Sequence, residues 1–180
     1  MITSESMPTT EVDNPDYCEI RRLRRCGADH KLAQKLTIAE VRDKVTDVAV
    51  GIVTRGLDKI LIAQRQQHQK LASFWEFPGG KMLSEESAYC ALRRELLEEV
   101  NIHTQSAYPL LNYLHHYDHA MVHLHFWHVT QFTGQVYGVE GQHTEWINTD
   151  QIGNYQFPAG NQAVIELIAK DSLLICHSSF

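Results

Sequence analysis

The sequence predicts an α/β fold in the form of a mixed sandwich, and three observations support this prediction. Runs rich in β-branched residues lie both before and after a helical pattern at residues 84–100. A second helical pattern occupies residues 161–170. The strands do not alternate regularly with helices, so a repeated β-α-β array is not expected. A chain of 180 residues is long enough for one domain with a proper core.

The first strands are predicted to form a hairpin. The segments VTDVAVGIVT and KILIAQR, residues 45–54 and 59–65, are β-rich and flank the turn-like segment RGLD. An irregular polar segment then leads to FWEFPGGK, residues 74–81. Its Pro-Gly-Gly triplet is expected to break regular structure and to let the backbone come close to another group.

The central helix is predicted to start at Ser84 and to run to Val100. Ser84 is a plausible N-cap, and Glu85 and Glu86 would then lie in the first turn, where acidic side chains are favourable. Strands are predicted at residues 108–117 and 120–132, joined as a second hairpin, and at 144–149. The closing helix carries one apolar face, formed by Val164, Leu167 and Ile168.

These patterns divide the chain into three parts. Residues 45–172 are predicted to form the compact domain, residues 1–44 a flexible or partly helical extension, and residues 173–180 a tail. The 16 Lys and Arg against 22 Asp and Glu give a net charge of −6, so stable nucleic-acid binding is not expected. The apolar runs are too short to span a bilayer, and the first residues lack the basic and apolar regions of a secretory signal. A cytoplasmic protein with no membrane contact is expected, and the sequence does not predict its oligomeric state.

The segment RRELLEEV places three carboxylates on one side of the predicted helix. Glu95, Glu98 and Glu99 have i, i+3 and i+4 spacing, at which like charges repel by roughly 0.2–0.5 kcal/mol per pair. They border the apolar stripe, where partly desolvated charges are costly without a counter-charge. Oxygen ligands gathered in this way indicate a hard divalent cation, Mg²⁺ or Mn²⁺. A solvated helix with Arg–Glu pairs is the alternative.

The surrounding residues resemble a known motif. GGKMLSEESAYCALRRELLEEVNI resembles the Nudix box, G-x5-E-x7-R-E-U-x-E-E-x-G-U, where U is a bulky aliphatic residue. The matching positions are Gly80, Glu86, Arg94, Glu95, Leu96, Glu98, Glu99 and Ile102. Asn101 stands where the family has Gly, and Asn tolerates the left-handed conformation that a Gly after a helix adopts. The resemblance implies an α/β/α sandwich around a mixed sheet.

The flanking segments resemble the MutT subgroup of that family, the 8-oxo-dGTP diphosphatases. WEFPGGK, VEGQ and FPAGN correspond to segments of that subgroup, and the resemblance covers residues 45–170. It implies that Arg94 orients Glu95 and that Glu86 supports the loop before the helix. The metal ligands implied by the resemblance are Glu95, Glu98, Glu99, Glu140 and the Gly79 carbonyl.

The same resemblance implies how a nucleoside triphosphate would be bound and cleaved. Arg65 and Lys81 would contact phosphates, while the Phe77 backbone and the Asn161 amide would contact the base. Without the resemblance, Phe77 would be interpreted as a core residue and Asn161 as a helix N-cap. The implied reaction is metal-dependent attack of water at the β-phosphorus, which yields 8-oxo-dGMP and pyrophosphate. Either Glu95 or Glu140 would be the general base.

Two other functions and one other site remain open from the sequence. The substrate could instead be another nucleotide or a pterin triphosphate, or the domain could bind nucleotides without hydrolysing them. His123 and His125 share a strand face, which raises the possibility of a transition-metal site. No third ligand is evident near them in the sequence, so a polar outer strand face is expected.

Overall fold

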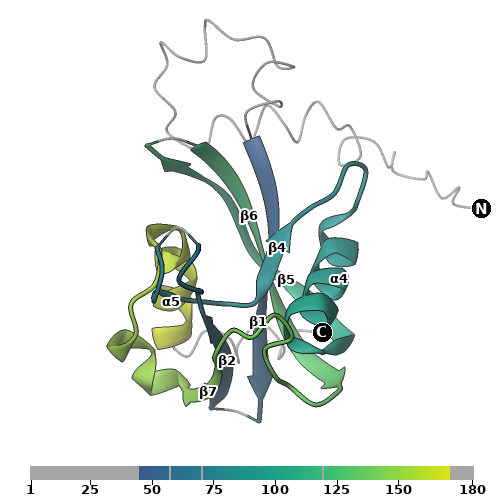
Figure 1. The fold of residues 1–180 in the computed structure, drawn as a ribbon, viewed down its shortest axis with the longest axis vertical. Helices are drawn as coiled ribbons and strands as arrows, with labels where there is room; N and C mark the ends of the chain where they lie inside the picture. The colour runs from purple at the N-terminus through teal and green to yellow at the C-terminus, as the bar shows by residue number, and fades with distance from the viewer. Residues whose placement is uncertain (1–44, 57, 70, 119, 171–180) are drawn as a thin grey trace, which may run out of the picture. The chain divides into compact units, whose positions relative to one another are not determined.

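The computed structural model describes residues 45–170, apart from residues 57, 70 and 119. The predicted extension and the predicted tail lie outside the described residues. The described chain forms a seven-stranded mixed sheet with one α-helix on each side (Figure 1). The predicted α/β sandwich is therefore confirmed. Within the described ranges, no helix has the length and apolar character needed to cross a membrane.

Strand β1, Val45–Arg55, lies in the middle of the sheet. One edge pairs in parallel with β6, Ala120–Thr133, in a register that runs from Val45 opposite Met121 to Val53 opposite Val129. The end of β1 pairs antiparallel with β2, Lys59–Gln64, as the predicted first hairpin requires. This arrangement joins two segments that are far apart in the sequence through a single central strand.

The second predicted hairpin is also present. Strand β5, His103–Tyr117, pairs antiparallel with β6 and contains register shifts between residues 104 and 111. It begins five residues before the predicted start at residue 108. The first residues of β5 are largely polar, which hid them from a search for apolar alternation, but His103 pairs with Thr133 at the end of β6.

Three short strands complete the sheet. Strand β3, Trp75–Glu76, and strand β7, Thr144–Asn148, both pair with β2, and β4, Gly79–Lys81, pairs with β1. The expected break of regular structure at Pro78–Gly80 is wrong in part, because Gly79 and Gly80 belong to β4. Gly79 has a φ of 151°, and a Cβ atom there would lie 2.2 Å from the Ala49 carbonyl oxygen. The glycine allows β4 to approach β1 closely.

Helix α4, Ala88–Val100, starts later than predicted and ends where predicted. Its N-cap is Ser87, whose hydroxyl accepts a hydrogen bond from the Cys90 amide, so the predicted cap at Ser84 is wrong. Glu85 has a positive φ of 61°, which keeps the chain out of the helical conformation just before Ser87. At the other end, Asn101 has the expected left-handed conformation, with φ 56° and ψ 39°.

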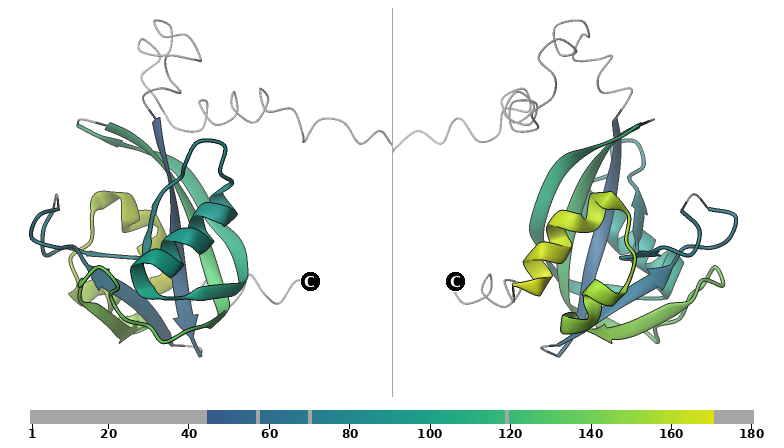
Figure 2. Two further views of the ribbon diagram at one scale, coloured as in Figure 1. Left: turned by 45° about the vertical axis from the view of Figure 1, so that its right-hand side comes forward. Right: turned by 90° about the vertical axis from the view of Figure 1, so that its left-hand side faces the viewer.

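The two sides of the sheet carry separate apolar cores, and Figure 2 shows the two α-helices that cover these opposite sides. The alternating side chains of β1 contribute to both, with Ala49 and Val53 on the α4 side and Val50 and Ile52 on the opposite side. Helix α5, Gln162–Ala169, packs on that opposite side. The short helices η1, Thr149–Asn154, and η2, Ala159–Asn161, lead into α5. Fully buried on the α4 side are Leu92, Leu96 and Val100.

Candidate functional site

Arg94 connects two carboxylates of α4, Glu95 and Glu98, with Glu86 in the loop that precedes the helix. Its Nη1 atom donates to Glu95 Oε1 at 2.7 Å and to Glu98 Oε2 at 3.1 Å. Its Nε and Nη2 atoms donate to the two oxygens of Glu86 at 3.0 and 2.8 Å. These bonds raise the pKa of Arg94 above its usual value, so the guanidinium is a permanent positive charge among the acids. The repulsion expected between the glutamates is thereby offset.

Glu86 joins this cluster to the loop that precedes α4. Its Oε2 atom accepts a hydrogen bond from the Leu83 amide at 2.9 Å in addition to the bonds from Arg94. The Arg94 guanidinium and the Leu83 amide together lower the pKa of Glu86. Arg94 also donates to the Lys81 carbonyl at 3.0 Å. Hydrogen bonds thus join the loop between β4 and α4 to the helix at both ends of the loop.

Glu99 lies on the side of α4 that faces β4. Its Oε2 atom accepts a hydrogen bond from the Gly79 amide at 3.0 Å. Burial raises the pKa of Glu99 to about 8, the Gly79 amide opposes this shift, and the charges of Glu76, Glu95 and Glu140 add to it. A buried acid surrounded by like charges favours the neutral form unless a positive charge joins it. The environment of Glu99 therefore favours a bound cation.

Gly80 provides the space that Glu95 occupies. A Cβ atom on Gly80 would lie 2.3 Å from Glu95 Oε2 and 2.4 Å from the carboxyl carbon of the same side chain. Only a residue without a side chain leaves the Glu95 carboxylate in this position. The Gly-Gly pair of β4 thus has two separate functions in the fold, since Gly79 faces the backbone of β1 and Gly80 faces a carboxylate of α4.

The predicted carboxylate ligands are neighbours, but their oxygens do not all lie within 4.8 Å of one another. Glu95 and Glu98 share one nitrogen of Arg94, and Glu99 bonds to β4 instead. Among the described residues, the group of three ligand atoms that all lie within 4.8 Å of one another is at Asp47, His123 and His125. The glutamate oxygens nevertheless fit a hard divalent cation, because Mg²⁺ and Mn²⁺ prefer carboxylate and carbonyl oxygens and keep several waters.

Glu140 lies in the turn that follows residue 137 and is exposed. Its charge raises the pKa of Glu99, so the two carboxylates are close enough to interact. Gln66 donates to the Glu140 carbonyl at 2.8 Å, and the Glu140 amide donates to the Gln142 side chain at 3.0 Å. The Gln142 side chain also donates to the Glu99 carbonyl at 2.9 Å. The backbone of the Glu140 turn is therefore held against the end of α4.

Arg65, a predicted phosphate contact, forms an ion pair with Glu76. The sequence reasoning did not select Glu76, although its charge stands between Trp75 and Phe77 in a strand-like segment, which was the available signal. Burial raises the pKa of Glu76, and Arg65 opposes that shift. Because Glu76 also interacts with Glu99, Arg65 lies in the same electrostatic environment as the carboxylates of α4. Lys81, the second predicted phosphate contact, is exposed at the end of β4.

The predicted base contacts lie in the other half of the sandwich. The Phe77 side chain is only 3% exposed and stacks on Phe157 with ring centroids 5.1 Å apart, so the side chain is a core residue. Asn161 is 8% exposed and stands at the start of α5, but its side chain makes no capping hydrogen bond. Asn161 therefore occupies the N-cap position of α5 that the simple interpretation predicts, but without the side-chain hydrogen bond of a capping residue. Both residues belong to the α5 side, whereas the carboxylates belong to the α4 side.

The expectation of a polar outer face around the paired histidines is also wrong. His123 is 6% exposed, and both imidazoles bond to Asp47 on the neighbouring strand. Sequence reasoning missed Asp47 because 76 residues separate it from His123. The parallel register of β1 and β6, which places Asp47 opposite His123, has no local signature in the sequence.

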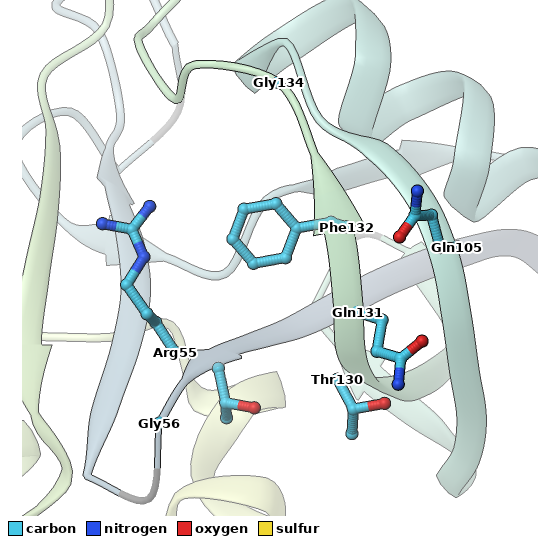
Figure 3. Close-up of a pocket in the computed structure, with 8 residues that line it drawn as sticks. Arg55, Gly56, Gln105, Thr130, Gln131, Phe132 and Gly134 are labelled. Carbon is cyan, nitrogen blue, oxygen red and sulfur yellow. The ribbon is translucent and has the colours of Figure 1, made fainter.

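A shallow hollow at the far end of β1 shares none of its lining residues with the predicted site. Figure 3 shows Arg55, Phe132 and Gln131 around it. The Arg55 guanidinium lies 4.3 Å from the centre of the Trp146 ring and 5.9 Å from that of Phe132. This stacking explains the position of Arg55 without a ligand.

Comparison with known proteins gives the context of this geometry. A sequence model of the NUDIX domain matches residues 49–167. An 8-oxo-dGTP diphosphatase of Escherichia coli K12 is 36% identical over 124 residues, which cover 68% of this chain and 95% of that protein. A CTP pyrophosphohydrolase of the same organism is 32% identical over 123 residues, covering 68% and 90%.

A solved structure supports the same relationship. It comes from a study of MutT from Aliivibrio salmonicida and Vibrio cholerae, has a TM-score of 0.62 and is 32% identical. The alignment covers 71% of this chain and 98% of the other. The similarity therefore extends over the sheet and both helices rather than over the acidic motif alone.

Proposed function

Because the chain belongs to the Nudix family, we propose that it is a metal-dependent pyrophosphohydrolase that converts 8-oxo-dGTP to 8-oxo-dGMP and pyrophosphate. The observation that carries the proposal is the arrangement around Arg94, which holds Glu95 and Glu98 beside the buried Glu99 and the glycines of β4. Clearing an oxidised nucleotide from the precursor pool would limit mutation. We place this activity in the cytoplasm.

The candidate ion is Mg²⁺, with Mn²⁺ as the alternative. Glu95, Glu98 and Glu99 would hold it, joined by the Gly79 carbonyl and Glu140. All of these ligand atoms are oxygens. The raised pKa of Glu99 shows that its carboxylate lies in a buried environment with too little positive charge nearby to stabilise it. When bound there, the ion would offset triphosphate charge and polarise the phosphorus that is attacked.

Residues of the chain would activate the attacking water. Arg94 fixes Glu95 through Oε1, which leaves Oε2, beside Gly80, to accept the proton of the attacking water. Glu140 is the other candidate base, and the fold holds its backbone near Glu99. The new P–O bond forms at the β-phosphorus, and the bond from that phosphorus to the bridging α–β oxygen breaks. The leaving group is the nucleoside monophosphate.

Arg65 and Lys81 would contact the phosphates. Arg65 is paired with Glu76, so a phosphate oxygen would have to replace or share that carboxylate. Lys81 is exposed and attached to β4, next to the glycines of the site. These two cations supply local positive charge in a chain whose net charge is −6.

Asn161 would read the base, together with the backbone of Phe77. The Asn161 amide both donates and accepts, and it is mostly buried and makes no capping hydrogen bond to α5. A buried amide of this kind is costly when unpaired, so it discriminates strongly between ligands that satisfy it and ligands that do not. This argument favours a purine whose edge offers both a donor and an acceptor.

A second substrate class is favoured by one observation. A relative that is 32% identical is a CTP pyrophosphohydrolase, which has the same chemistry with a pyrimidine substrate. The chain could therefore act on another nucleotide or on a pterin triphosphate. A nonhydrolytic nucleotide-binding module is the third candidate, and the complete set of acids around Arg94 argues against it.

The test is pyrophosphate release in the presence of Mg²⁺ from 8-oxo-dGTP, dGTP, dCTP, CTP and dihydroneopterin triphosphate. We expect selectivity for 8-oxo-dGTP and loss of activity in Glu99→Gln. Asn161→Ala should reduce the preference for 8-oxo-dGTP over dGTP more than it reduces the turnover of dCTP. Preference for another substrate would discard 8-oxo-dGTP but keep the chemistry, and inactivity on every substrate would favour the nonhydrolytic module.

A further inference from the structure

Asp47, His123 and His125 form a second cluster of potential metal ligands, apart from the glutamates of α4. His123 Nδ1 lies 2.7 Å from Asp47 Oδ1, and His125 Nε2 lies 2.9 Å from the same oxygen. The two imidazole rings are 3.8 Å apart between centroids and are inclined by 68°. One ligand atom from each of the three residues lies within 4.8 Å of the other two.

The sheet itself fixes this arrangement. Asp47 is directly opposite His123 in the parallel pairing of β1 with β6, and His125 follows two residues later on the same face. All three side chains therefore extend from the backbones of two paired strands rather than from loops. Ligands on rigid elements lose little conformational entropy when they bind an ion.

The cluster is buried on the side of His123 and accessible to solvent on the side of Asp47. The His123 side chain is 7% exposed and that of His125 19% exposed, whereas the Asp47 carboxylate is 37% exposed. An ion could approach from the side of Asp47, where water could complete the coordination. Three protein ligands with one open position are typical of zinc sites that are not purely structural.

We propose that Asp47, His123 and His125 bind a divalent transition-metal ion, and that Zn²⁺ is the ion that suits them best. Two imidazole nitrogens and one carboxylate oxygen suit Zn²⁺ and its neighbours, whereas Mg²⁺ prefers oxygen alone. With Zn–N and Zn–O distances of about 2.0–2.1 Å in tetrahedral geometry, ligand atoms lie about 3.3 Å apart. The present Asp47–His123 and Asp47–His125 separations of 2.7 and 2.9 Å lie within about 0.6 Å of that value, and the ligand atoms of the two imidazoles lie within 4.8 Å of each other.

This site is chemically distinct from the proposed magnesium site. Asp47 is two residues before Ala49, which pairs with Gly80, so the same strand borders both sites. The Met82 amide donates to the Asp47 carbonyl at 2.9 Å and continues the contact between β1 and the chain after β4. A metal at the cluster would cross-link β1 to β6 without using any carboxylate of α4.

The test uses the 180-residue chain carrying Glu98→Gln and Glu99→Gln, which weaken the proposed magnesium site. Zn²⁺ titration by calorimetry, and Co²⁺ titration followed by visible absorption, should show one equivalent bound. Adding His125→Ala should weaken binding by more than about 100-fold, since loss of a ligand exceeds the 10–100-fold effect of losing an outer-shell partner. The intense Co²⁺ bands of a tetrahedral site should disappear as well.

Two further variants keep the result interpretable. His103→Ala removes an exposed histidine of β5 outside the cluster and should leave the Zn²⁺ affinity unchanged. Asp47→Asn keeps the side-chain size, so it should fold and still lose affinity. The absence of saturable binding would overturn the proposal, and so would equal Zn²⁺ affinity with and without His125. Either result would leave the cluster as a hydrogen-bonded trio alone.

Discussion

The acidic cluster on α4 and the Asp47–His123–His125 cluster are assembled in different ways. The glutamates occupy neighbouring turns of one helix, so helical spacing alone brings them together. The aspartate and the histidines come from two strands, and Asp47 is separated from His123 by 76 residues. The first cluster is local in sequence and the second is not. A site is predictable from one sequence to the extent that a single helix or strand carries its residues.

The largest expected change is in catalytic activity, and it tests whether the two clusters are functionally separate. Glu98→Gln should lower kcat/KM for pyrophosphate release by about 100- to 1000-fold, the typical cost of removing one preorganised electrostatic group. His125→Ala should leave the same rate with Mg²⁺ unchanged, because its imidazole contacts no carboxylate of α4 in the described structure. Steady-state kinetics on both variants provide the measurement. Equal losses would mean that the clusters act as one site.

A pair of glycine substitutions tests how far the acidic cluster depends on its neighbouring strand. Gly79→Ala should lower the free energy of unfolding by about 2–5 kcal/mol, because the new Cβ meets the Ala49 carbonyl and φ is unfavourable. The atoms nearest to a Cβ on Gly80 belong to the end of the Glu95 side chain, which can move. Gly80→Ala should leave stability nearly unchanged and lower activity by about 100-fold through displacement of that carboxylate. Urea unfolding and kinetics, measured on both variants, separate the two effects.

If Gly80→Ala instead unfolds the protein as strongly as Gly79→Ala, the Glu95 carboxylate is held rigidly. The acidic cluster would then depend on the contact between β4 and α4 as much as on helical spacing. The contrast between the two clusters would be correspondingly weaker.

The pH dependence of the free energy of unfolding should report on the buried carboxylate of Glu99. The folded-state pKa of Glu99, about 8, exceeds its ordinary value of 4.5, so the metal-free folded protein binds more protons than the unfolded chain between those values. Stability from this residue is therefore full below pH 4.5 and is lost as pH rises through 8, by up to about 1.4 kcal/mol per pH unit. Urea unfolding with a chelator from pH 5 to 9 measures the slope.

Glu99→Gln removes the titrating group and should flatten this slope. Added Mg²⁺ should restore stability at high pH in the natural chain but not in the variant. An unchanged slope in Glu99→Gln would show that another group is responsible.

The smallest expected effect concerns the start of α4. Ser87→Ala should lower the free energy of unfolding by about 1 kcal/mol, because the hydroxyl caps the Cys90 amide. Ser84→Ala, at the position predicted from the sequence, should change stability by less than about 0.5 kcal/mol. Thermal melts of the two variants provide the comparison. A larger effect at Ser84 would restore the original prediction of the helix start.

Much of the fold could be predicted because the patterns are local. Both hairpins, the end of α4 and the left-handed conformation of Asn101 follow from short-range periodicity and backbone preference. The start of α4 was misplaced, since either Ser84 or Ser87 could cap it and the Glu86 contacts that shape the loop are not visible in sequence. Strand β4 was missed because its pairing depends on a close approach to β1 that only the fold reveals.

The candidate site also combines features that are local in the sequence with contacts that depend on the tertiary structure. The spacing of the carboxylates is visible in the sequence, and the Arg94 contacts agree with it. The ion pair between Arg65 and Glu76, by contrast, depends on the pairing of β2 with β3, and the burial of Asn161 depends on packing at the start of α5. Cross-element contacts of this kind require the tertiary structure, and the roles proposed for these residues remain predictions.

The parallel pairing of β1 with β6 has a consequence for how the chain folds as it is made. Asp47 is synthesised 76 residues before its partner His123, which at about 5–20 residues per second is a delay of roughly 4–15 s. During that time the apolar edge of β1 lacks its partner strand, a condition that favours aggregation or chaperone binding. The loss of chain entropy on closing this long connection also costs about 2 kcal/mol more free energy than closing the first hairpin.

We therefore expect the amides of residues 45–53 to gain hydrogen-exchange protection together with those of β6. Pulse labelling during refolding would measure the order of protection. Protection of β1 in step with β2, before β6, would show that the first hairpin stabilises the strand on its own. In the expected order, the Asp47–His123–His125 cluster cannot form until β6 has been synthesised, whereas the glutamates of α4 come together as soon as that helix forms.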